Sequence, residues 1–193
     1  MSELATLQTV IQQILHHMPS DWTTLTTHRL DIYDESQAKV QFVEGLQRLL
    51  DEGTVTEATL STLPTAYDYV RLGHQLSSVL EWGIGHLYGV SVGQVISFAS
   101  QTMPLLALLR SATVHKQQTV VYHDCALPEV LFMPEVESVY GYTARFVRIE
   151  SVRDISAKDS GLVVFVTNEP LIDGRVISGV DATINLSSAF GSV

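Results

Sequence analysis

Apolar residues recur every three or four positions in the first third of the chain, the spacing that one face of an α-helix produces. The first stripe consists of Leu4, Leu7, Ile11, Ile14 and Met18, and Pro19 follows it. The second stripe predicts a helix from Ser36 to Glu52 that stops at Gly53. Thr56 with Glu57 predicts one more helical turn. We expect these elements to form a helical extension over residues 1–63.

A third helical period occupies the second half of the segment Tyr67–Gly89. Its apolar positions are Leu76, Val79, Leu80, Ile84 and Leu87. Gly89 stands where a C-terminal cap belongs, because glycine readily adopts the left-handed conformation of such caps. The residues before this helix are polar and aromatic. We expect the segment to open an α/β core over residues 64–193.

After Gly89 the pattern changes to short apolar, β-branched runs separated by helical or polar segments. The runs that predict strands are Val92–Ser100, Thr119–Asp124, Thr143–Ile149, Gly161–Thr167 and Asp181–Leu186. A helix is predicted over Thr102–Ser111, with Pro104 in its first turn, and a broken helix over Pro128–Ser138. Strands joined by such crossovers predict a three-layer α/β fold with a mostly parallel sheet.

Charge excludes one class of partner. The 193 residues carry a formal net charge of −10 and include only three lysines. Nucleic-acid binding needs clustered lysine and arginine, so we expect no such surface. One cysteine, Cys125, excludes an internal disulfide and fits a reducing compartment, which favours a cytoplasmic location. No apolar stretch approaches ~18 residues, so we expect neither a membrane span nor a signal peptide.

The segment that begins at Tyr67 resembles part of a known enzyme family. Tyr69, Arg71, Gly73, Leu80 and Glu81 match the Tyr-x-Arg-x-Gly motif and the following Leu-Glu pair of the Cys/Met-metabolism pyridoxal-phosphate enzymes, the family of cystathionine γ-synthase and methionine γ-lyase. The resemblance implies the large-domain fold of fold-type-I enzymes. It also implies that Tyr69 and Arg71 are vestigial contacts to a cofactor phosphate held by a neighbouring subunit. We therefore expect a homo-oligomer or a protein partner that contacts Tyr67–Leu76.

Three residues differ from the family pattern at positions that bind the cofactor in the family. In the resemblance, Thr102 takes a glycine position in the phosphate-binding turn within Ser97–Met103, and Ala126 takes the place of a tyrosine that stacks on the cofactor ring. Ala189 takes the place of the lysine that forms the imine. The available lysines are Lys39, Lys116 and Lys158, and none ends a predicted strand.

These departures predict a non-catalytic protein retained for interaction, assembly or regulation, without a bound cofactor. The alternative is a working pyridoxal-phosphate enzyme of sulfur amino-acid metabolism that uses an unrecognised lysine. A further alternative is a half-site subunit that completes a partner's active site with Tyr69 and Arg71. The departures favour the absence of enzymatic activity.

The sequence contains one further group of reactive side chains. His123, Asp124 and Cys125 are adjacent in a predicted strand, where neighbours point to opposite faces and cannot form a proton relay. His123 and Cys125 share a face, and His74 or His86 would complete a metal site with them. A buried structural pair explains the same two residues more simply, so we predict no metal site.

Overall fold

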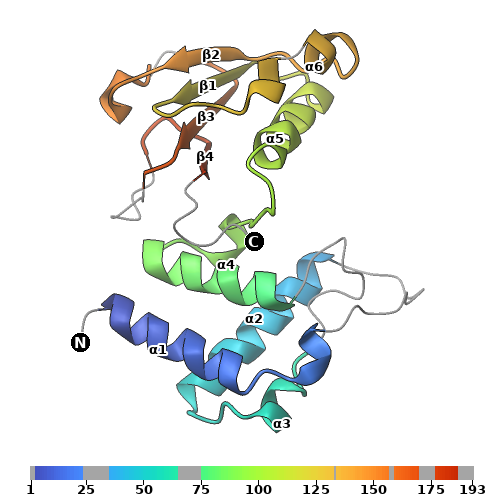
Figure 1. Cartoon of the computed structure of the whole chain (residues 1–193), viewed down its shortest axis with the longest axis vertical. Coiled ribbons are helices and arrows are strands. Elements are labelled where there is room, and N and C mark those ends of the chain that lie inside the picture. The colour runs from blue at the N-terminus through green and yellow to red at the C-terminus, as the bar shows by residue number, and fades with distance from the viewer. Residues whose placement is uncertain are drawn as a thin grey trace. The chain divides into compact units, whose positions relative to one another are not determined.

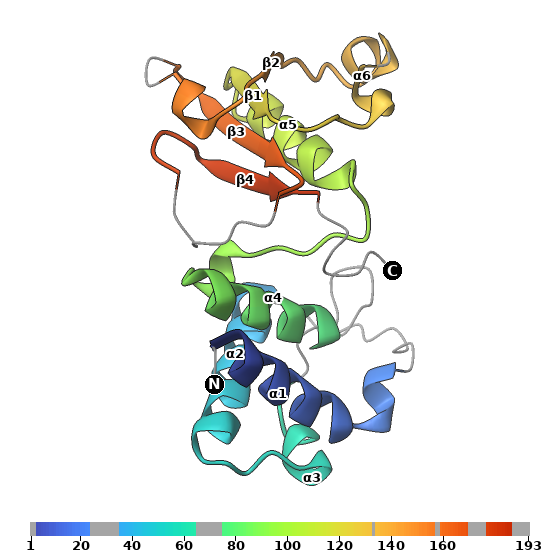
Figure 2. The same cartoon turned by 60° about the vertical axis from the view of Figure 1, so that its left-hand side comes forward.

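The computed structural model describes residues 3–23, 35–64, 75–132, 134–156, 159–169 and 177–186. The chain forms two compact units, Met1–Ser97 and Phe98–Val193. Figures 1 and 2 show the helical first unit in blue to green and the sheet-containing second unit in light green to red. The helical part thus extends beyond residue 63, where the sequence pattern placed its end. No helix among the residues described has the length and apolar character needed to cross a membrane.

The described part of the first unit contains four α-helices. They are α1 (Glu3–His16), α2 (Glu35–Asp51), α3 (Glu57–Leu60) and α4 (Gln75–Tyr88), with 3₁₀ turns η1 (Ser20–Thr23) and η2 (Val92–Gln94). The first three agree with the predicted helices, and α4 agrees with the stripe that precedes Gly89. Helix α4 packs on α1 and α2, so it belongs to the helical unit and not to the α/β core.

One apolar core holds this unit together. Its buried side chains are Ile14, Trp22, Phe42, Val43, Leu46, Val55, Leu60, Val79 and Trp82. Val55 comes from the connection between α2 and α3, and the others come from the four helices and from η1, so the stripes read from the sequence face one another. The short helix α3 depends on its cap: the Thr56 side chain accepts from the Thr59 amide, and the Thr59 side chain accepts from the Thr56 amide.

The strand predicted at Val92–Ser100 is wrong. The segment contains η2 and then an irregular stretch, because side chains of the helical unit bind its backbone. Lys39 Nζ donates to the Val95 carbonyl at 2.9 Å. The Ser97 amide donates to Glu81 Oε1 at 2.7 Å. These backbone groups are therefore already satisfied without a neighbouring strand.

The second unit contains a four-stranded, all-parallel sheet in the order β2-β1-β3-β4. Its strands are β1 (Thr119–His123), β2 (Arg145–Arg148), β3 (Leu162–Thr167) and β4 (Ala182–Asn185). Four of the five predicted strands are confirmed, and with them an α/β fold with a parallel sheet. Among the strands of the described ranges, β2 and β4 are the outermost of the sheet.

Helical segments connect these strands. Helix α5 (Met103–Val114) precedes β1, and η3 (Glu129–Phe132), α6 (Pro134–Ser138) and η4 (Val152–Asp154) follow in the connections. The predicted helix at Thr102–Ser111 and the broken helix at Pro128–Ser138 are confirmed, the latter as η3 and α6.

Both faces of the sheet are covered by apolar side chains. On one face, Leu105 and Leu109 of α5 join Val121, Val164 and Val166 in a buried cluster. On the other, a second cluster contains Val120, Tyr122, Ile149, Val163 and Phe165, with Ile155, Ile177 and Val180 packed against it. The continuous apolar runs of β1 and β3 follow from this burial on two sides.

Candidate functional site

The strand order defines where a ligand is expected. The connection from β1 leads to β2 on one side, whereas β3 and β4 follow on the other side of β1. The order therefore reverses between β1 and β3. Open α/β sheets bind ligands beyond the carboxyl ends of their strands at such a point. His123 pairs with Val166 in this ladder, so Asp124 and Thr167 come next at the carboxyl edge.

Hydrogen bonds within the chain occupy most polar groups at this edge. Thr167 Oγ1 donates to Asp124 Oδ2 at 2.9 Å. The Glu169 amide donates to Thr167 Oγ1 at 3.1 Å, and Asn185 Nδ2 donates to the Glu169 carbonyl at 3.1 Å. The other carboxylate oxygen, Asp124 Oδ1, is buried and has no hydrogen-bond partner among the described residues. The edge thus offers one unpaired acceptor and no described lysine.

The side chains of His123 and Cys125 each contact a backbone carbonyl within the chain. The Nδ1 atom of His123 lies 2.8 Å from the carbonyl oxygen of Cys125, a bond to backbone. The Cys125 side chain is buried, and this burial raises the pKa of its thiol, with a smaller contribution from the charge of Asp124. A thiol held protonated is a poor nucleophile and a poor metal ligand.

The metal hypothesis also involved two further histidines. His86 lies on α4 in the helical unit, and His74 is outside the described residues. Within the described ranges, no three His, Cys, Asp or Glu side chains come close enough to hold a metal ion.

The N-terminus of α5 is the position that the resemblance assigns to a cofactor phosphate. The Ser100 hydroxyl accepts from the amide of Thr102 at 3.2 Å and from the amide of Met103 at 3.3 Å. These are two of the first N–H groups of the helix, the groups that would bind an anion. Because the predicted strand before them is absent, the expected strand-to-helix turn is a loop-to-helix junction.

The described lysines do not lie at the carboxyl edge of the sheet. Lys39 Nζ forms an ion pair with Glu81 Oε2 at 2.5 Å, and both side chains are largely buried. Lys116 lies in the turn between α5 and β1, at the amino end of the sheet. Lys158, Ala189, Tyr69 and Arg71 lie outside the described residues, as do residues 67–74 of the predicted contact segment.

An apolar surface near the outer strand β2 was not recognised from the sequence. Val130 and Phe132 lie in η3, Val139 and Tyr140 directly follow α6, and α6 contacts η3; we call these four exposed side chains, two of them aromatic, the aromatic patch. The Phe132 ring lies 5.0 Å from the ring of Phe146 on β2, and Tyr140 stacks on Tyr142 at 5.5 Å. Such contacts fix exposed rings in place. The signal in the sequence was the density of large apolar residues around Pro134.

Comparison with known proteins finds no family model, curated protein or solved structure that matches this chain. The resemblance to pyridoxal-phosphate enzymes therefore rests on the matched residues alone.

Proposed function

We propose that this chain is a non-catalytic protein of interaction, assembly or regulation, with an α/β unit that resembles the core of pyridoxal-phosphate enzymes. The observation that carries the proposal is the cap on α5. The Ser100 hydroxyl already accepts from the Thr102 and Met103 amides, so a cofactor phosphate would have to displace it. The Cβ of Thr102, where the family has glycine, adds crowding at the same place.

The positions of the lysines support the same proposal. Imine formation needs a neutral amine beside the bound cofactor. The Lys39 amine is held by the Glu81 carboxylate and the Val95 carbonyl within the helical unit, so imine formation would have to break both contacts. Lys116 lies at the amino end of the sheet, whereas ligands of parallel sheets bind at the carboxyl end.

The test is incubation with pyridoxal phosphate, reduction with borohydride and measurement of the intact mass. We expect no stoichiometric adduct on the wild-type chain, because attachment, phosphate anchoring and ring stacking are all lost. A lysine-dependent pyridoxal-phosphate enzyme treated in parallel serves as the positive control. A stoichiometric adduct on Lys39, Lys116 or Lys158 would overturn the proposal and establish a pyridoxal-phosphate protein.

The aromatic patch supports the interaction part of the proposal. Phe132 is 56% exposed, Val139 68% and Tyr140 60%, although each is a side chain that folding normally buries. Aromatic residues are enriched where proteins contact one another, and clustered exposed apolar groups mark such surfaces. The proposed occupant is a second copy of the chain or another protein.

Mass measurement by light scattering at micromolar concentration tests homo-oligomer formation. We expect the wild-type mass to exceed the 21.3 kDa of one chain. The double variant Phe132→Ser, Tyr140→Ser should lower that mass towards one chain. The matched control is Val114→Ser, which removes a side chain that is 70% exposed at the end of α5. A monomeric wild type, or equal effects of patch and control variants, would remove this patch as a homo-oligomer contact.

A further inference from the structure

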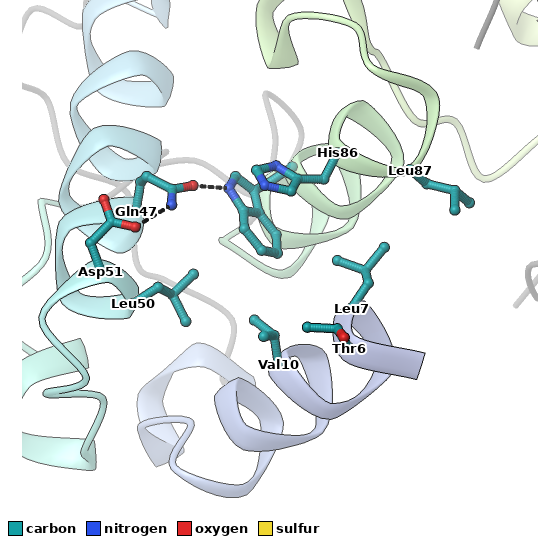
Figure 3. A pocket seen from close by; sticks show the side chains of 9 residues that line it. Thr6, Leu7, Val10, Gln47, Leu50, Asp51, His86 and Leu87 are labelled. Carbon is teal, nitrogen blue, oxygen red and sulfur yellow. Dashed lines mark hydrogen bonds between the residues drawn. The ribbon is translucent and has the colours of Figure 1, made fainter. Parts of the chain in front are cut away.

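The helical unit contains a pocket that the proposed function does not use. It has a volume of about 360 Å³ and lies among α1, α2 and α4. Its lining consists of Thr6, Leu7, Val10, Gln47, Leu50, Asp51, Trp82, His86 and Leu87. In Figure 3, Gln47, Leu50 and Asp51 project from one helix, His86 and Leu87 from a second, and Thr6, Leu7 and Val10 from a third below them. An apolar lining with a few polar groups, at this size, is typical of small-molecule sites.

A chain of hydrogen bonds fixes one wall of this pocket. The indole N–H of Trp82 donates to Gln47 Oε1 at 2.9 Å. Gln47 Nε2 in turn donates to Asp51 Oδ1, also at 2.9 Å (Figure 3). The rings of Trp82 and His86 lie 4.7 Å apart, 30° from parallel. These contacts orient the Trp82 side chain, which is 5% exposed, and link it through Gln47 to the carboxylate of Asp51 at the exposed rim of the pocket.

The charged residues of the pocket lining indicate which charge a ligand should carry. Asp51 is the one residue among the nine that is an acid, and no lysine or arginine is among them. A carboxylate has about four acceptor positions, so Asp51 retains capacity beyond its bond from Gln47. An aromatic face attracts cations, most strongly that of tryptophan. The formal net charge of −10 also attracts cations to the protein over a longer range.

We propose that this pocket binds a small organic cation, an ammonium group attached to an apolar or aromatic body. The ammonium donates to Asp51 and lies against the aromatic wall of Trp82. The apolar body contacts Leu7, Val10 and Leu50. This site lies within the helical unit and is independent of the imine chemistry considered for the α/β unit.

The experiment is a calorimetric titration of the full chain with 2-phenylethylammonium, and with the neutral 2-phenylethanol and the anionic phenylacetate. We expect saturable binding of the ammonium and at least tenfold weaker binding of the other two. Asp51→Asn keeps an acceptor for Gln47 but removes the charge. It should weaken ammonium binding about tenfold or more, the effect of one charge-assisted hydrogen bond.

Glu52→Gln is the matched control, because it makes the same change of net charge at the next position, outside the lining. Ammonium binding by this variant should stay within about twofold of wild type. Three results would overturn the proposal: no saturable binding below roughly 10 mM, equal affinity for the alcohol or the acid, and equal weakening by the two variants. The tryptophan emission of Asp51→Asn, measured without ligand, checks that Trp82 keeps its surroundings.

Discussion

Asp159 joins three parts of the second unit through its carboxylate. The Tyr122 hydroxyl donates to Oδ2 of Asp159, and Arg145 Nη2 donates to Oδ1 at 2.6 Å. The Ser156 amide donates to the Tyr122 hydroxyl at 3.1 Å. The hydrogen bond from Tyr122 lowers the pKa of Asp159, and the charge of Arg145 lowers it further. The ionised carboxylate therefore ties the connection before β3 to β1 and β2.

This lowered pKa predicts a pH dependence of stability. A carboxyl group whose pKa is lower in the folded state contributes stability above its unfolded pKa, about 3.9, and loses it as the pH falls through the folded pKa. Asp159→Asn should therefore lower the melting temperature at pH 7. The difference between variant and wild type should shrink as the pH falls below about 4. Thermal melts between pH 3 and pH 7 measure both effects.

Glu150→Gln is the control, because Glu150 is an exposed carboxylate outside this network. Its melting profile should follow that of wild type. If Asp159→Asn shows the same difference from wild type at every pH, the carboxylate charge does not contribute in the way proposed.

At the scale of elements, apolar composition identified four strands and misidentified one. Val120–Tyr122 and Val163–Val166 are buried on both faces of the sheet, so composition alone indicated strands there. Val92–Ser100 has a similar composition. Its backbone, however, binds Glu81 and Lys39, which are distant along the chain, and no periodic pattern encodes those contacts.

Single residues of the candidate site at the sheet edge could be predicted from the sequence, but the contacts between them could not. Asp124 follows an apolar run, and a polar residue at the end of a strand indicates the edge where ligands bind. Thr167 is the last residue of β3 and could have been recognised by the same rule. Its hydrogen bond to Asp124 spans 43 residues and depends on strand order, which the sequence did not supply. The pocket of the helical unit needs three helices packed together, so its residues share no local pattern.

At the scale of the whole molecule, each unit has its own core. Leu46 is buried in the core of the helical unit, and Leu109 is buried between α5 and the sheet. The only two tryptophans, Trp22 and Trp82, are both buried in the helical unit. Tryptophan emission therefore reports on that unit alone, whereas circular dichroism reports on both.

We predict that the two units unfold in separate steps. Leu46→Ala should lower the midpoint of the tryptophan transition, because such a core deletion costs about 2–5 kcal/mol. Leu109→Ala is the matched change in the second unit. It should leave the tryptophan midpoint unchanged and lower the midpoint of a second transition seen by circular dichroism. Equal shifts of the tryptophan midpoint in both variants would indicate a single cooperative unit instead.

The position of β2 at the margin of the sheet has a consequence for aggregation. An outer strand presents unpaired backbone groups to which another chain can add. Strand β2 has the sequence Arg-Phe-Val-Arg, and both arginines are exposed. If two copies paired antiparallel along this margin with their centres aligned, Arg145 of each would lie opposite Arg148 of the other, and like charges directly opposite are unfavourable. These exposed arginines thus disfavour pairing of further chains along β2, Arg148 more than Arg145, because the charge of Arg145 is already paired with Asp159.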